Sequence, residues 1–269
     1  MNQDGARSRH CRRFPGQRRR AYALTIQGRG GSLLAMPDAT HYREMPIREC
    51  GEPLRALPEA IGRRTPHPYA QLGAPYGDAS PFLLRRGVVE RLSLAENHIQ
   101  RVAPGLRLVV FDAYRPVAVQ RFMVGWTFQQ QLERAGLSVQ SLTEAERQAV
   151  LAQVYQFWAP PSLDPATPPP HSTGGAVDLT LADAEGNELD MGSAIDEIGA
   201  RSYPEHFAAA DTEPERTFHA RRTLLYDAMA SAGFRRHPRE WWHFSWGDQL
   251  WALLAGEPAA HYGRADLCR

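Results

Sequence analysis

The sequence lacks lysine altogether, so all 31 of its basic residues are arginines. It also lacks any apolar run of the roughly 18–20 residues that a membrane-crossing helix needs, so we expect no membrane partner. Cysteine is scarce, because only Cys11, Cys50 and Cys268 occur and they lie far apart. Three dispersed thiols predict neither a disulfide framework nor a thiolate metal site, and they are compatible with a reducing compartment.

Positive charge is scarce over most of the chain. Residues 1–35 hold eight arginines and one acid, so the remaining residues hold 23 arginines and 29 acids, a formal charge of −6. A nucleic-acid-binding domain needs a basic face on the fold itself. We therefore expect no nucleic-acid partner.

The first 35 residues show no hydrophobic periodicity, which predicts a disordered basic extension before a single domain at residues 36–269. Their apolar stretch, Ala21–Ile26, is shorter than the roughly 7–15 residues of a secretory core, so we expect no export and a cytoplasmic location. The alternatives are an arm that adheres to RNA or membranes, and a reading-frame extension upstream of a native start at Met36 or Met45. We favour the extension.

Apolar periodicity predicts both helices and strands. Spacings of three and four predict helices at Val88–Val102, Val117–Ala135, Thr143–Phe157 and Thr212–Ala232, whereas runs of β-forming residues predict strands at Leu106–Phe111 and Ala176–Leu181. This mixture predicts an α+β fold with a central, mainly antiparallel sheet and flanking helices packed on one side of it.

The stretch His171–Asp178 offers a nitrogen and an oxygen ligand for a divalent metal. Gly174 and Gly175 between them allow a tight turn with positive φ, after which a strand begins. On that strand Asp178 points away from the aliphatic neighbours Val177 and Leu179, so it can face a cleft. The alternative interpretation is a glycine turn beside a solvated aspartate.

A second pair, Glu240 and His243, follows about sixty residues later. A metallopeptidase needs a third protein ligand and a carboxylate that acts on water without binding the metal. Residues three apart on one strand face opposite sides, so Glu240 must precede the strand that carries His243. Alternatively, the tryptophans around this pair form a buried strand and the pair lies at its rim. His219 and His237 are competing ligand candidates that we interpret as structural.

Arg115 follows the strand Leu106–Phe111, in a turn that Pro116 closes. A guanidinium stays charged and presents forked donors, which suit a developing oxyanion. The alternative role is a turn brace paired with Asp112.

Together the motifs Asp112–Pro116, His171–Asp178 and Glu240–His243 resemble the zinc D-alanyl-D-alanine dipeptidases of the VanX type, among the zinc D,D-peptidases related to the hedgehog fold. The resemblance extends from about Met45 to the C-terminus. It implies one zinc ion per chain, with the zinc ligands His171, Asp178 and His243, and it makes Glu240 the general base and Arg115 the group that stabilises the tetrahedral intermediate.

The resemblance also bears on the substrate, a small D,D-dipeptide. An acidic residue of similar dipeptidases meets the substrate amine, and Asp196 is our candidate for it; a solvated loop aspartate is the alternative. These dipeptidases carry a serine two residues before the first zinc histidine, where this chain has Pro169. The contact of that serine is therefore lost or replaced.

Two other functions stay open at this point. One is a zinc D,D-carboxypeptidase or endopeptidase acting on peptidoglycan, and the other is a noncatalytic module with structural zinc. The sequence leaves open the oligomeric state and the choice between cell-wall dipeptide recycling and glycopeptide resistance.

Overall fold

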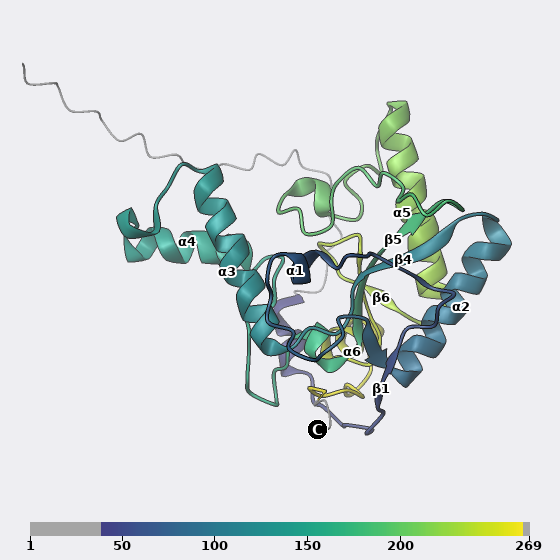
Figure 1. The fold of residues 1–269 in the computed structure, drawn as a ribbon, viewed down its shortest axis with the longest axis horizontal. Coiled ribbons are helices and arrows are strands. Elements are labelled where there is room, and N and C mark those ends of the chain that lie inside the picture. Colours follow the sequence, from purple (N-terminus) through teal and green to yellow (C-terminus); the bar gives the residue numbers. More distant parts are fainter. Residues whose placement is uncertain (1–38, 266–269) are drawn as a thin grey trace, which may run out of the picture. The chain divides into compact units, whose positions relative to one another are not determined.

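The computed structural model describes residues 39–265, so the predictions for residues 1–35, Met36, Cys11 and Cys268 fall outside the described part. Its larger sheet has the strand order β2-β4-β5-β7-β6 (Figure 1). The bounds are β2 (Gly62–Arg63), β4 (Arg107–Asp112), β5 (Ala176–Ala182), β6 (Arg235–Arg236) and β7 (His243–Ser245). Strand β2 runs parallel to β4 and the other pairings are antiparallel, which confirms the predicted sheet.

All four predicted helices are present: α2 (Arg86–Val102), α3 (Val117–Arg134), α4 (Glu144–Val154) and α5 (Glu213–Ser231). A capping box of Thr143 and Glu146 starts α4. The shorter elements are η1 (Ala39–Glu44), α1 (Pro68–Gln71), η2 (Val139–Ser141), η3 (Pro170–Thr173), η4 (Ala200–Ser202), α6 (Gln249–Ala255) and the paired strands β1 (Leu54–Ala56) and β3 (Leu83–Arg85). Within the described range, no helix is long and apolar enough to cross a membrane.

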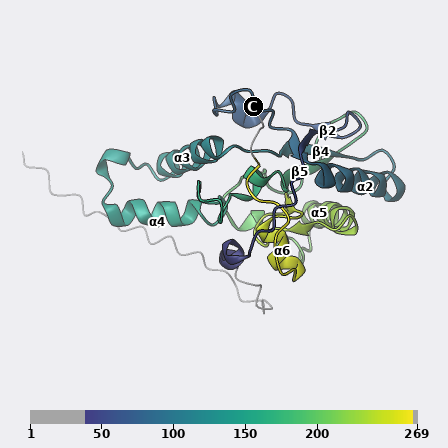
Figure 2. The ribbon, with the colours of Figure 1, turned by 90° about the horizontal axis from the view of Figure 1, so that it is seen from below.

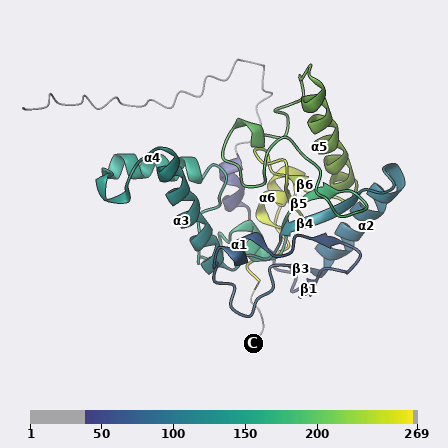
Figure 3. The same cartoon turned by 45° about the horizontal axis from the view of Figure 1, so that its top comes forward.

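The long helices divide between two sides of the sheet, so the expectation of helices on one side is wrong. In Figure 2, α2 and α5 lie side by side on one flank, whereas α3 and α4 lie on the other, and Figure 3 shows the same division. Strand β4 serves both groups because its side chains alternate. Leu108 and Val110 are buried in the core that α2 and α5 cover, while Phe111 packs with Val119 and Met123 of α3.

Strand register places three polar side chains in one row. Asp178 on β5 is opposite His243 on β7 and also opposite Asp112 on β4, where an irregularity after Val110 shifts the register by one residue and interrupts the alternation along β4. Val177 and Leu179 point into the core that α2 and α5 cover, so Asp178 points to the other face, as predicted. The row therefore crosses three neighbouring strands at one level of the sheet.

A glycine turn returns the chain to this row. Gly174 ends η3 with φ +72°, a left-handed conformation, as predicted for the turn. A Cβ on Gly174 would collide with Cδ2 of Leu54, and one on Gly175 would lie 2.9 Å from the carbonyl oxygen of Trp246. The buried guanidinium of Arg85 also donates to the carbonyl of Thr173 at 2.8 Å. The turn before β5 is therefore fixed by both shape and hydrogen bonding.

We predict that Gly174→Ala destabilises the protein by about 2–4 kcal/mol. A left-handed alanine costs about 1 kcal/mol, and the clash with Leu54 adds about 1–3 kcal/mol of overpacking. Gly186→Ala is the matched control, because Gly186 has φ +89° and open space around it. Urea unfolding measures both variants, and equal losses of stability would show that packing against Gly174 does not matter.

Candidate metal centre and active site

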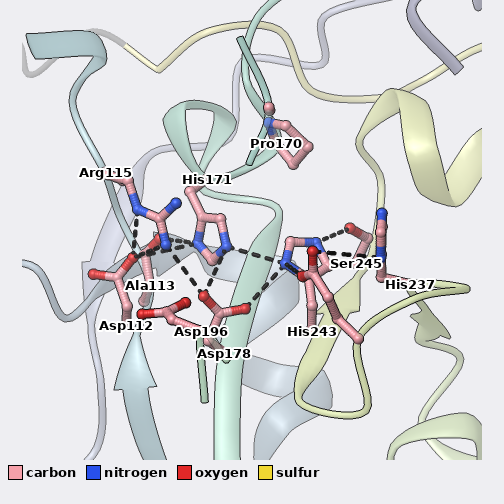
Figure 4. A network of polar contacts seen from close by, with 12 residues as sticks. Asp112, Ala113, Arg115, Pro170, His171, Asp178, Asp196, His237, His243 and Ser245 are labelled. Atoms are coloured by element: carbon pink, nitrogen blue, oxygen red, sulfur yellow. Dashed lines mark hydrogen bonds and ion pairs between the residues drawn. The ribbon is translucent and has the colours of Figure 1, made fainter. Parts of the chain in front are cut away.

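Three buried side chains converge on one point. His171 Nε2 lies 3.1 Å from His243 Nδ1 and 3.2 Å from Asp178 Oδ2, and His243 Nδ1 lies 3.0 Å from Asp178 Oδ1 (Figure 4). Their ligand atoms all lie within 4.8 Å of one another. Strands β5 and β7 supply two of them, and η3 supplies His171. The structure thus brings together the three residues proposed as ligands from the sequence.

Hydrogen bonds on the far side of each ring define the tautomers. His171 Nδ1 lies 2.8 Å from the carbonyl oxygen of Ala113, which can only accept, so Nδ1 donates and Nε2 keeps its lone pair. Ser245 donates its hydroxyl proton to Asp248 at 2.7 Å, so Ser245 Oγ accepts from His243 Nε2 at 3.3 Å. The lone pair of His243 is then on Nδ1, which faces His171.

The three facing ligand atoms require a cation between them. Two imidazole lone pairs and the Asp178 carboxylate face one another, an arrangement that is repulsive without a positive charge between them. Burial lowers the pKa of His243, which favours the neutral ring that binds metals. Two histidines and one carboxylate with a fourth position open suit a catalytic zinc ion.

Glu240 lies beside the donor set without joining it. It precedes β7 in a loop, as predicted, and its Oε2 lies 3.7 Å from His243 Nδ1. Burial raises the pKa of Glu240 well above its usual value, and the nearby carboxylates Asp178 and Asp196 add to the effect. A carboxyl group with a raised pKa exchanges a proton near neutral pH more readily than an ordinary one.

Arg115 leaves β4 in the predicted turn and is held on several sides. Its Nε donates to Asp112 at 2.9 Å, its Nη1 to Gln120 at 2.9 Å and its Nη2 to Asp178 at 3.2 Å. The guanidinium also lies 4.8 Å from the ring centre of Trp158. The brace to Asp112 therefore coexists with a position at the metal site. Nη1 has a second N–H, and Figure 4 shows this nitrogen directed away from Asp112.

Asp112 explains why Arg115 keeps one orientation. This fully buried carboxylate lies 3.0 Å from His67 Nε2, accepts from the Tyr76 hydroxyl at 2.9 Å and also binds Arg115. Burial raises the pKa of Asp112, but Arg115 and then His67 outweigh it, so the pKa is lowered overall. The sequence predicted Asp112 only as a partner of Arg115.

Asp196 lies at the same site, half-buried, with φ +66°. The Tyr69 hydroxyl donates to its Oδ2 at 2.6 Å. Burial, followed by repulsion from Asp178, raises the pKa of Asp196 to about 7. A cation beside Asp196 would offset both the cost of burying its charge and the repulsion from Asp178.

A cavity of about 290 Å³ joins these groups. Arg115, Asp196, Glu240 and the three metal-site residues line it, together with Tyr42 and Arg43 of η1 and Trp158. That volume is at the lower limit of about 300–1,000 Å³ for ligand pockets, so it suits a small ligand.

His237 also lines the cavity, whereas His219 does not. The Nδ1 of His237 lies 3.6 Å from Glu240 Oε1, and the His237 ring packs edge-on against His243. This contact could not be predicted from the sequence, because His237 has no partner at metal-site spacing. Three further residues of the site could not be predicted from the sequence, because tertiary folding alone brings them there: Tyr69, Gln120 and Trp158.

Comparison with known proteins gives one consistent family. A D-alanyl-D-alanine dipeptidase of Synechocystis sp. is 46% identical over 238 residues, which is 84% of this chain and 96% of that protein. The Escherichia coli D-alanyl-D-alanine dipeptidase is 32% identical over 142 residues, which is 52% of this chain and 55% of that protein.

Among solved structures, the vancomycin resistance D,D-pentapeptidase VanY in complex with Zn(II) aligns with a TM-score of 0.43 at 12% identity, covering 81% of this chain and 96% of that chain. The LD-carboxypeptidase LdcB aligns with a TM-score of 0.40 at 15% identity, covering 77% of this chain and 73% of that chain. The family model described as D-ala-D-ala dipeptidase, peptidase M15, matches residues 63–261. The chain therefore belongs to the peptidase M15 family of D-alanyl-D-alanine dipeptidases.

Proposed function

We propose that this enzyme hydrolyses the dipeptide D-alanyl-D-alanine, with one zinc ion held by His171, Asp178 and His243 and with Glu240 as general base. The observation that carries the proposal is the position of Glu240. Its carboxylate shares the cavity with the three-donor site and lies 3.7 Å from His243 Nδ1, yet it is not part of the donor cluster. A noncatalytic zinc module would have no use for such a carboxylate.

The residues divide the chemistry between them. When bound, zinc polarises the scissile carbonyl and lowers the pKa of water. Glu240 accepts a proton from the attacking water and returns it to the leaving amine. Arg115 donates a hydrogen bond to the carbonyl oxygen as negative charge develops there, and Asp112 and Gln120 hold its guanidinium ready for that charge.

The cavity favours a dipeptide over a polymer. Its volume of about 290 Å³ suits a small ligand, and the Asp196 carboxylate can receive the free amine of a dipeptide. The small D,D-dipeptide stays our proposed substrate, and the cytoplasmic location stays a prediction from the sequence.

We predict that the wild type cleaves D-Ala-D-Ala in preference to L-Ala-L-Ala and to a muropeptide. Glu240→Gln should fold and retain zinc, but its kcat should fall about 10²–10⁴-fold, since general acid–base catalysis contributes that much. Steady-state kinetics and metal analysis test both statements, with Glu205→Gln as control, because Glu205 is an exposed carboxylate that pairs with Arg236. Preferential muropeptide cleavage would support the peptidoglycan alternative, and full activity of Glu240→Gln would refute the assigned base.

Removal of the metal should abolish hydrolysis and lower the melting temperature. The donors repel one another without a cation, and a ligand that binds only the folded state stabilises it. Adding zinc back should restore both properties. His243→Gln should fail to bind stoichiometric zinc, whereas the control His98→Gln, on exposed α2 surface, should bind it normally. Unchanged zinc binding by His243→Gln would contradict the ligand set.

The role of Asp196 predicts a requirement for the free amine. N-acetyl-D-Ala-D-Ala should be a poor substrate of the wild type. Asp196→Asn should lower kcat/KM for the dipeptide about 10–100-fold, as expected for a lost charge-assisted hydrogen bond. The same variant should reduce the difference in kcat/KM between the dipeptide and its N-acetyl derivative. Asp227→Asn on the exposed face of α5 is the control. Equal rates for both substrates in the wild type would rule out amine recognition.

A further inference from the structure

Arg239 is a cation in the cavity wall that the proposed chemistry does not use. It is half-buried, immediately precedes Glu240 and lines the cavity. Its backbone N–H donates to His237 Nδ1 at 3.2 Å, so the loop that carries it is anchored at the site. Among residues 39–265, its guanidinium has no hydrogen bond or ion pair. A half-buried guanidinium without such partners is suited to bind an anion that arrives with the substrate.

Arg43 is a second such cation. It belongs to η1 and lines the same cavity. Its Nη2 donates to the carbonyl oxygen of Pro160 at 3.1 Å and its Nε to the Tyr42 hydroxyl at 3.4 Å, but within the described range it pairs with no carboxylate. Gln249 holds η1 in place, because its Nε2 donates to the carbonyl oxygens of Arg43 and Met45. The two cations that line the cavity thus come from segments far apart in sequence.

Two buried arginines of the described range, Arg115 and Arg222, differ from Arg239 and Arg43. Arg115 is paired with Asp112 and Asp178. Arg222 donates to three backbone carbonyl groups and to the Ser193 hydroxyl. Both guanidinium groups have partners inside the protein that hold them in place, so their positions are explained by the fold. The guanidinium of Arg239 is not explained in this way.

Charge in the cavity follows an order that matches a zwitterionic dipeptide. Asp196 and Arg115 lie on one side of the donor cluster, and His237 lies on the opposite side (Figure 4). The backbone N–H of Arg239 donates to His237 and Arg239 lines the cavity, so Arg239 enters the cavity from the segment that also holds His237. A dipeptide has an ammonium group at one end, a carboxylate at the other and the scissile bond between them.

We propose that Arg239, assisted by Arg43, binds the C-terminal carboxylate of the substrate and restricts the enzyme to peptides with a free C-terminus. This subsite rests on the proposed dipeptidase function and adds a specificity-determining residue to it.

The decisive comparison uses D-alanyl-D-alanine and D-alanyl-D-alaninamide, which differ only in the charge at the C-terminus. The wild type should cleave the acid with a kcat/KM about 10–100-fold above that of the amide, the range expected for a charge-assisted contact. In Arg239→Gln this ratio should fall toward one, mainly through a higher KM for the acid. Arg239→Lys should keep part of the ratio, because the charge remains without the forked donors.

The amide separates carboxylate binding from a general electrostatic effect. Loss of a cation near Glu240 would change its pKa and slow both substrates equally, whereas loss of a carboxylate contact affects the acid alone. Arg101→Gln, exposed at the end of α2, is the matched control and should keep the wild-type ratio. Zinc content and circular dichroism show that each variant is folded.

The outcomes are distinct. An unchanged acid-to-amide ratio in Arg239→Gln, or equal cleavage of both substrates by the wild type, would overturn the subsite and leave the dipeptidase function standing. Failure of the zinc-loaded wild type to cleave the acid at all would instead refute the dipeptidase function. A ratio that falls in Arg239→Gln and partly returns in Arg239→Lys would support the subsite.

Discussion

The structure depends on one constraint, the register of three neighbouring strands. Because Asp112, Asp178 and His243 are paired across β4, β5 and β7, they occupy one level of the sheet and point to the same face. A shift of one residue in β5 would turn Asp178 into the core and bring Val177 or Leu179 to the site. The apolar side of β5 therefore fixes the metal site as firmly as the polar side does.

Buried charge is tolerated at this site because each charged group has a partner in the protein or a proposed role in catalysis. The Asp112 carboxylate is matched by Arg115, His67 and Tyr76, and in turn it holds Arg115 in place. The donors on His171, Asp178 and His243 face one another and require a cation. Asp196 and Glu240 have raised pKa values because burial and the other carboxylates oppose their ionisation. Such groups are costly to the fold and useful to catalysis.

The sequence predicted the parts of this site that lie in short motifs. Backbone preference and strand periodicity predicted the left-handed conformation of Gly174, the face of β5 on which Asp178 lies and the loop position of Glu240. The structure confirms all three predictions. Contacts made across long separations had no local signal. Tyr69, which meets Asp196 across 127 positions, and Arg43, which meets Pro160 across 117, could not be predicted because tertiary packing alone brings them together.

The central claim is that three protein donors, and not Glu240, hold the zinc ion. A crystal structure of the zinc-loaded protein, with anomalous scattering data collected at the zinc edge, tests it most directly. We predict one strong anomalous peak about 2.0–2.2 Å from His171 Nε2, His243 Nδ1 and an Asp178 oxygen, with Glu240 outside bonding distance. A peak bonded to Glu240 or to His237, or no peak at this site, would contradict the account.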